Sequence, residues 1–114
     1  MEVNVSHAIR GNILEIAFKD ANCDAMNTPA LKKKILKLID QTGCSKIVFD
    51  LSGLQFIDSS GLGLFLSIQR ALYDHGGKLK IACLNKPIQT VFEIVSMHRI
   101  FEIYPTVHDA VKSF

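Results

Sequence analysis

Apolar and polar side chains alternate in two short stretches at the start of the chain. The apolar positions are Val3, Val5, Ile9, Leu14, Ile16 and Phe18. Alternation of this kind is typical of a β-strand with one buried face. Gly11-Asn12 separates the two stretches and is typical of a tight turn. The pattern therefore predicts two strands joined as an antiparallel hairpin.

A loop, a helix and a buried strand are expected next. Residues 19–27 are mostly polar and predict the loop. Thr28 and Pro29 suit the N-cap and the first position of a helix, and Gly43 suits its end. The apolar positions of this helix fall on one face and are Leu31, Ile35, Leu38 and Ile39. The apolar run at 47–49 then predicts a central strand that is buried on both faces.

The second half of the chain continues to alternate helices with strands. A helix is expected from the Asp-Ser-Ser-Gly turn at 58–61 to Gly76-Gly77. The next strand is predicted where Leu79, Ile81 and Cys83 alternate with Lys78, Lys80 and Ala82. Pro87 opens a helix whose apolar face is Ile88, Val91, Phe92 and Val95. A short edge strand at 100–103 follows, and Thr106 has capping-box spacing to Asp109 at the start of a last helix.

The expected order is β-β-α-β-α-β-α-β-α, which predicts an α/β fold in a single domain over residues 1–114. The hairpin makes the sheet mixed, with four to five strands and helices packed on it. Ligands of such sheets bind outside the carboxyl ends of the parallel strands. We therefore expect the 58–61 turn to lie at a binding edge, together with the 19–27 loop.

Composition narrows the class of protein. Hydrophobic residues make up 48% of the 114 positions, enough for a sizeable core. No apolar stretch reaches the ~18–20 residues that cross a bilayer, and the start of the chain lacks the pattern of a secretory leader. A formal net charge of +2 is too small to indicate a polyanionic partner. We therefore expect a cytoplasmic protein that binds neither nucleic acid nor membrane.

Several site chemistries are disfavoured by the motifs. Ser59 lacks the Gly-x-Ser-x-Gly elbow of serine hydrolases, and no phosphate-binding loop is present. The cysteines are odd in number and far apart, and the histidines are scattered, so neither a disulfide framework nor a metal site is predicted. Asp24, Asp50 and Asp58 lack the short fixed spacing of a metal-binding loop.

The turn at Asp58, Ser59, Ser60 and Gly61 is the most informative part of the chain. It lies between an apolar run and a helical pattern, where unpaired backbone N–H groups require acceptors and negative charge is favoured. In one interpretation the three polar side chains share the capping of the helix. In the other, Ser59 accepts phosphate from a separate kinase. Gly61 and Gly63 suit close packing of the helix on the sheet.

The sequence from Ile47 to Leu66, with its Asp-Ser-Ser-Gly-Leu core, closely resembles the signature of STAS domains. Within that family it resembles the bacterial anti-sigma factor antagonists. The segment Cys23-Asp-Ala-Met-Asn27 is similar to the family's Leu-Asp-Ala-x-Asn segment, with a cysteine in place of the usual aliphatic residue. Similarity extends to Gly76-Gly-Lys-Leu-Lys-Ile81 and to 100–111.

The resemblance implies a binding module that is not an enzyme and holds no cofactor or metal. It implies that Ser59 is the phosphoacceptor, and that Asp24, Asp58, Ser60 and Gly61 surround it on the surface that binds a partner. The implied partners are an anti-sigma factor with GHKL-type serine kinase activity and a PP2C-type phosphatase. The alternative is a STAS subunit of a membrane transport or lipid-trafficking complex, in which the same turn contacts an ATPase subunit.

Overall fold

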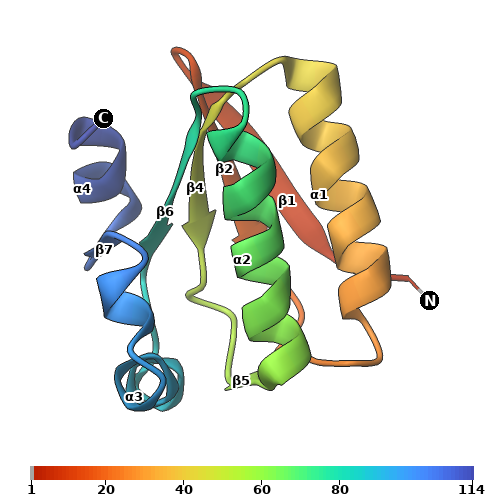
Figure 1. The fold of residues 1–114 in the computed structure, drawn as a ribbon, viewed down its shortest axis with the longest axis vertical. Coiled ribbons are helices and arrows are strands. Elements are labelled where there is room, and N and C mark those ends of the chain that lie inside the picture. The colour runs from red at the N-terminus through yellow and green to blue at the C-terminus, as the bar shows by residue number, and fades with distance from the viewer. Residues whose placement is uncertain (1) are drawn as a thin grey trace.

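Five strands form one mixed sheet in the computed structural model, which describes residues 2–114 (Figure 1). The strand order is β1-β2-β4-β6-β7, with β1 antiparallel to β2 and the other neighbours parallel. Their bounds are β1 Val5–Arg10, β2 Ile13–Phe18, β4 Lys46–Asp50, β6 Lys78–Ala82 and β7 Ile103–Tyr104. The predicted α/β fold with an opening hairpin is confirmed.

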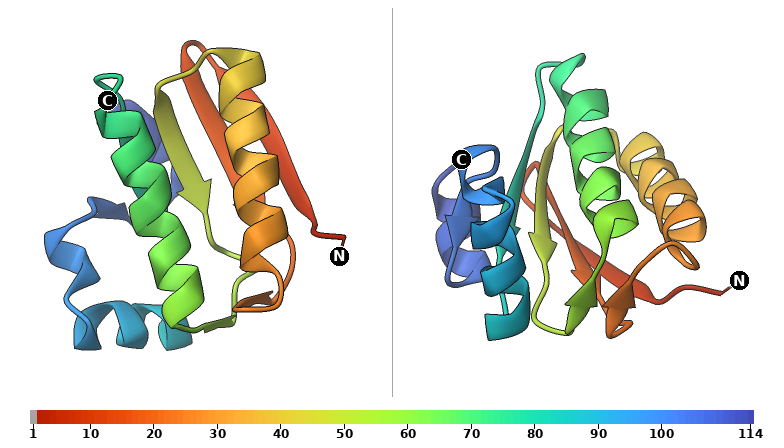
Figure 2. Two further views of the ribbon diagram at one scale, coloured as in Figure 1. Left: turned by 45° about the vertical axis from the view of Figure 1, so that its right-hand side comes forward. Right: turned by 60° about the horizontal axis from the view of Figure 1, so that its bottom comes forward.

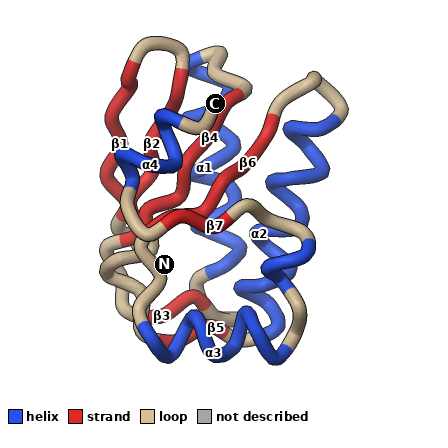
Figure 3. Tube along the Cα trace, turned by 90° about the vertical axis from the view of Figure 1, so that its left-hand side faces the viewer, coloured by secondary structure: helices blue, strands red, loops and turns tan. Residues whose placement is uncertain are grey.

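The helices lie on both sides of this sheet (Figure 3). The helices α1 (Thr28–Thr42) and α2 (Ser59–Tyr73) cover one face, and α4 (Val107–Lys112) covers the other face over β4 and β6. The helix α3 (Lys86–Ile94) and a 3-10 turn at Met97–Arg99 connect β6 to β7. Because β4 has a helix on either side of it, Ile47, Val48 and Phe49 are all fully buried, as the apolar run predicts.

Four aromatic rings form the centre of the core under α2. Phe49 of β4 packs against Phe18 and Phe65 with ring centroids 5.0 and 5.3 Å apart, and Phe65 reaches Phe92 of α3 at 6.2 Å. Tilted and edge-to-face pairs at these distances add to the stabilisation from burial alone. The rings tie β2, β4, α2 and α3 together just behind the edge where the parallel strands end.

A second, two-stranded sheet lies beyond that edge and was not predicted. The strands β3 (Asn22–Cys23) and β5 (Phe56–Ile57) pair in parallel, and the right-hand view of Figure 2 shows them near the starts of α1 and α2. The prediction of a plain loop at 19–27 is therefore wrong at 22–23. Two-residue strands give too short an alternation to be recognised in sequence.

Two predicted helix positions differ from the structure. The N-cap of α1 is Asn27 and not Thr28, because the carbonyl of Asn27 already accepts a hydrogen bond from Leu31 N at 2.9 Å. The apolar face predicted for α3 is correct at Ile88 and Phe92, but Val95 lies at the C-cap with 45% of its surface exposed. Gly43 ends α1 in the left-handed conformation, as predicted.

The strands of the second half also differ in detail. The edge strand is Ile103–Tyr104 and not 100–103, because Ile100 and Phe101 are drawn into the 3-10 turn by hydrogen bonds to the Met97 carbonyl. Cys83 lies past the end of β6 with φ 64°, so it does not continue the alternation. Lys80, which the alternation sets opposite the apolar positions of this strand, is nevertheless buried and bonded to Ser113 after α4.

Candidate partner-binding site

Asp58 holds the turn at the start of α2 in place. Its Oδ1 accepts a hydrogen bond from Gly61 N, and its Oδ2 accepts one from Ala25 N, each at 3.0 Å. The first bond caps α2 and the second ties the cap to the segment between β3 and α1. Asp58 N also donates to the Cys23 carbonyl at 3.2 Å. One carboxylate therefore joins the two loops that the topology placed at the same edge.

The second loop is organised by Asp24 and Asn27. Asp24 Oδ1 accepts hydrogen bonds from Met26 N at 3.0 Å and Asn27 N at 3.3 Å. The buried side chain of Asn27 accepts a bond from Asp24 N at 2.9 Å and donates to the Asn22 carbonyl at 2.7 Å. These bonds close a rigid turn of the Asx type. The turn holds the backbone of Ala25 where Asp58 can bind it.

Gly61 allows this close arrangement, whereas Gly63 does not contribute to it. A Cβ on Gly61 would lie 2.5 Å from both the Cys23 carbonyl oxygen and Ile57 Cγ1, which is too close for any side chain. A Cβ on Gly63 would meet nothing within 4 Å. The prediction of close packing is confirmed at Gly61 and is wrong at Gly63, which faces outward.

Cys23 lies beneath the two loops and is inert. Burial, together with the nearby carboxylates of Asp58 and Asp24, raises the pKa of its thiol from 9.0 to about 12. A thiol that stays protonated is a poor nucleophile and a poor metal ligand. Cys23 therefore fills the core position that an aliphatic residue would otherwise occupy.

Ser59 and Ser60 follow the cap but differ in exposure. Ser59 is exposed as the first residue of α2, and Ser60 is half-buried. Ser60 lines a shallow hollow between α1 and α2 with Thr28, Lys32, Gly63 and Ser67. In the described part of the chain neither hydroxyl makes a hydrogen bond, so Asp58 alone supplies the side-chain cap. The interpretation that three side chains share the capping is wrong.

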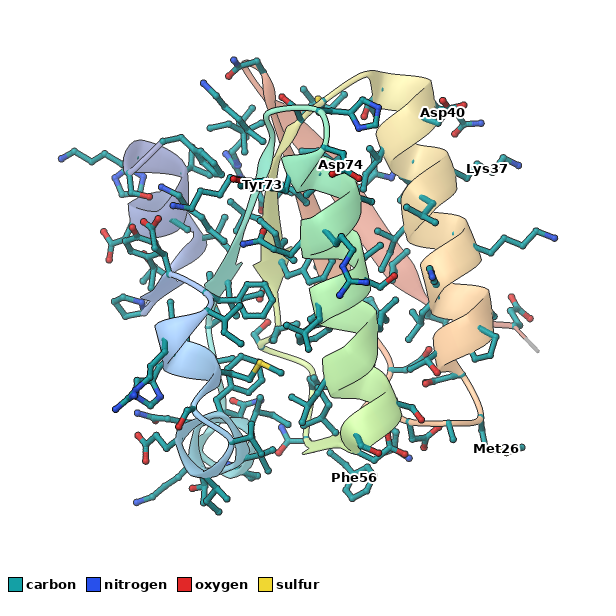
Figure 4. All side chains as sticks on the ribbon, viewed as in Figure 1. Met26, Lys37, Asp40, Phe56, Tyr73 and Asp74 are labelled. Carbon is teal, nitrogen blue, oxygen red and sulfur yellow. The ribbon has the colours of Figure 1, made fainter. Side chains whose placement is uncertain are left out.

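All five predicted site residues lie at one end of the molecule. Asp58, Ser59, Ser60 and Gly61 form the start of α2, and Asp24 belongs to the loop bonded to it. The sequence analysis missed the hydrogen bonds by which Asn27 and Asp24 close the loop, although Asp24 and Asn27 are residue types typical of an Asx turn. It also missed two exposed apolar side chains at this end, Met26 and Phe56 (Figure 4).

Two kinds of feature are absent from the part of the chain that the structure describes. Among residues 2–114, no three histidine, cysteine or acidic side chains gather as a metal site requires. No helix formed by these residues is both long and apolar enough to cross a bilayer. What the site does present is an exposed hydroxyl beside a carboxylate at a helix N-terminus, where added negative charge is tolerated.

The sequence pattern of the STAS domain family matches residues 6–110, which is most of the chain. The chain belongs to the STAS domain family. The anti-sigma F factor antagonist of Paenibacillus polymyxa is 28% identical over 81 residues, covering 71% of this chain and 69% of that protein. The anti-sigma-B factor antagonist of Bacillus subtilis is 26% identical over 103 residues, covering 90% and 92%.

Solved structures show that the STAS fold is shared. The anti-sigma factor antagonist SpoIIAA in its unphosphorylated form has a TM-score of 0.80 to this chain at 21% identity, covering 96% of this chain and 95% of that one. The Bacillus SpoIIAA in the phosphorylated form has a TM-score of 0.72, also at 21% identity, covering 96% and 98%. The sheet order and helix placement described above are therefore those of a STAS domain.

Proposed function

We propose that this STAS domain is an anti-sigma factor antagonist whose binding is switched by phosphorylation of Ser59. The observation that carries the proposal is the exposed, unbonded hydroxyl of Ser59 on a turn already capped by Asp58. Because the cap does not depend on Ser59, its hydroxyl is available for modification. The names of the Paenibacillus and Bacillus relatives support the antagonist role.

Ser59 is favoured over Ser60 as the acceptor. Ser59 is exposed, whereas Ser60 is half-buried in the hollow between α1 and α2. A kinase has to bring its nucleotide in line with the hydroxyl that it modifies, and the exposed residue offers that access. The family resemblance selects the same serine, the first after the aspartate.

Phosphorylation is expected to change binding more than folding. A phosphoserine carries roughly −1.5 to −2 charges at neutral pH. The N-terminus of α2 accepts such a charge, because the helix dipole is positive there. A partner whose nucleotide phosphates lie beside Ser59 would instead be repelled, and Asp58 adds to the negative charge of the surface. Like charges brought together at an interface cost several kcal/mol.

The proposed partners follow from this role. The unphosphorylated protein binds an anti-sigma factor of the GHKL-type serine kinase class and so frees a sigma factor. A PP2C-type phosphatase removes the phosphate and restores binding. The protein works in the cytoplasm as a regulator of transcription, and it supplies a phosphoacceptor and a binding surface while its partners supply catalysis.

Phosphate mapping tests the proposal. The purified protein is incubated with ATP and, in turn, each GHKL-type serine kinase encoded in its own genome, and the products are mapped by mass spectrometry. We expect one phosphate on Ser59 with one of the kinases. Ser60→Ala should still be modified, whereas Ser59→Ala should not. Modification of Ser60 alone, or of neither serine by kinases active on their other substrates, would contradict the proposal.

A further inference from the structure

Two large apolar side chains at the end of the molecule that carries Ser59 are not covered by the fold. Met26 is 73% exposed and Phe56 is 53% exposed. Phe56 lies in β5, three residues before Ser59, and Met26 follows Ala25, whose N–H is bonded to Asp58. Figure 4 shows both residues at the end of the molecule where α2 begins, with Phe56 next to the start of α2 and Met26 in the loop that leads to α1. We call Met26 and Phe56 the anchor pair.

The anchor pair is held on rigid backbone. Asn22 and Phe56 are register partners in the small sheet, and Phe56 N donates to the Ala21 carbonyl at 3.0 Å. Met26 N is bonded to Asp24 Oδ1 at 3.0 Å. Because the backbone is already fixed, a partner that covers these side chains has to restrict only their rotamers and not the loop, which lowers the cost of binding.

An acidic hollow adjoins Met26. Its lining includes Met26 and three acidic residues, Glu2, Asp20 and Asp24, and no lysine or arginine. The Asp20 carboxylate accepts two hydrogen bonds from Asn4, and Asp24 Oδ1 is bonded to backbone N–H groups, which fixes both carboxylates at the surface. A surface with this charge is complementary to a basic side chain on the partner.

We infer that the anchor pair and the acidic hollow carry most of the affinity of the Ser59 site for the anti-sigma factor. The matching surface of the anti-sigma factor is then apolar opposite Met26 and Phe56, with a lysine or arginine opposite Glu2, Asp20 and Asp24. This inference rests on the proposed function. It assigns affinity and regulation to different residues of one site: the anchor pair provides affinity, and Ser59 provides the switch.

Titration calorimetry with the kinase that modifies Ser59 tests the inference on the full, unphosphorylated chain. Met26→Ala and Phe56→Ala should each weaken binding by about tenfold or more, as truncation of a central apolar contact does. Ile9→Ala and Tyr73→Ala are matched controls, since these side chains are also exposed, at 53% and 79%. Tyr73 is the last residue of α2 and Ile9 pairs with Leu14 near the start of β2, so neither belongs to the end with the turn. The controls should bind as the unmodified chain does.

The role of the acidic hollow is tested by the salt dependence of the affinity. Glu2→Gln combined with Asp24→Asn should reduce the dependence of affinity on salt, since exposed charge pairs are screened by ions. An unchanged salt dependence would overturn the role of the hollow.

Three further results would overturn the inference, and the third would also overturn the proposed function. If the anchor variants bind as tightly as the unmodified chain, Met26 and Phe56 do not provide the affinity, but the proposed function is unaffected. Self-association of the chain that is lost in Met26→Ala and Phe56→Ala would assign this face to a second copy instead. Absence of both binding and Ser59 modification in the unmodified chain would remove the proposed function, and the inference with it. Circular dichroism of each variant identifies any loss of fold.

Discussion

At the scale of single residues, two glycines of α2 have opposite surroundings. A methyl group on Gly61 would overlap the Cys23 carbonyl and Ile57, whereas one on Gly63 would meet open space. We expect Gly61→Ala to lower the free energy of unfolding by about 1–3 kcal/mol through overpacking. Gly63→Ala should raise it by roughly 0.5–1 kcal/mol, because alanine favours a helix interior. Urea denaturation measures both, and equal effects would contradict the described packing.

The buried thiol gives a second prediction at this scale. The pKa of Cys23 is raised from 9.0 to about 12 in the folded state. Above about pH 9 the unfolded chain ionises this thiol while the folded chain does not, so stability falls as pH rises. Iodoacetamide at pH 8.5 should label the partly exposed Cys44 in the native protein and should label Cys23 only in urea. Rapid native labelling of Cys23 would contradict its burial.

At the scale of elements, one carboxylate joins α2 to the loop after β3. Asp58→Ala removes the bonds to Gly61 N and Ala25 N, and we expect it to destabilise the fold by about 1–2 kcal/mol. Asp58→Asn keeps one acceptor oxygen, so its stability should lie between those of the unmodified chain and Asp58→Ala. Hydrogen exchange at Gly61 and Ala25 should be faster in Asp58→Ala. Unchanged exchange at Ala25 would show that the loop does not depend on the cap.

The C-terminal helix depends on a buried lysine. Lys80 Nζ donates to Ser113 Oγ at 2.8 Å and to the Ser113 carbonyl at 3.1 Å, and it lies 4.2 Å from the centre of the Phe114 ring. Glu102, bonded to Lys78 and Tyr104 and 3.3 Å from Lys80, balances the charge, and these bonds lower the pKa of Glu102 to about 2. The contacts of Lys80 with Ser113 and Phe114 therefore hold α4 on the sheet.

Substitution of Lys80 and Lys78 in turn distinguishes the buried contacts of Lys80 from the effect of a charge at the surface. Lys80→Met should cost about 1–3 kcal/mol, because hydrogen bonds from a buried cation are lost. Lys78→Met, at an exposed ion pair, should change stability by no more than about 0.5 kcal/mol. Hydrogen exchange in α4 should increase only in Lys80→Met. Equal effects of the two substitutions would contradict a specific role for Lys80.

These elements show how far the sequence predicts the fold. Alternation predicted β1, β2 and β6, and the apolar run at 47–49 predicted β4. Burial leaves such a pattern in β2, β4 and β6, whereas β1 is exposed along nearly its whole length and the edge strand was predicted at the wrong residues. The burial of Lys80 could not be predicted, since its partner Ser113 lies 33 positions away. The same holds for the pairing of β3 with β5, whose strands are too short to show a period.

At the scale of the whole molecule, the fold separates the packed sheet and helices from the end that we propose binds a partner. The aromatic core and α1, α2 and α4 hold the sheet, while Ser59, the anchor pair and the acidic hollow gather where the parallel strands end. The topology predicted that the two loops would meet, whereas the choice of Ser59 came from the family resemblance. The exposure of Met26 and Phe56 had no trace in the sequence, because apolar residues are expected to be buried.

The central claim is that one phosphate on Ser59 switches association without unfolding the protein. The most direct test is the affinity for the anti-sigma factor kinase, with ADP bound, before and after complete phosphorylation of Ser59. We predict binding at least about tenfold weaker after phosphorylation, from the like-charge penalty, with the unfolding midpoint nearly unchanged. Equal affinity of the two forms would contradict the account.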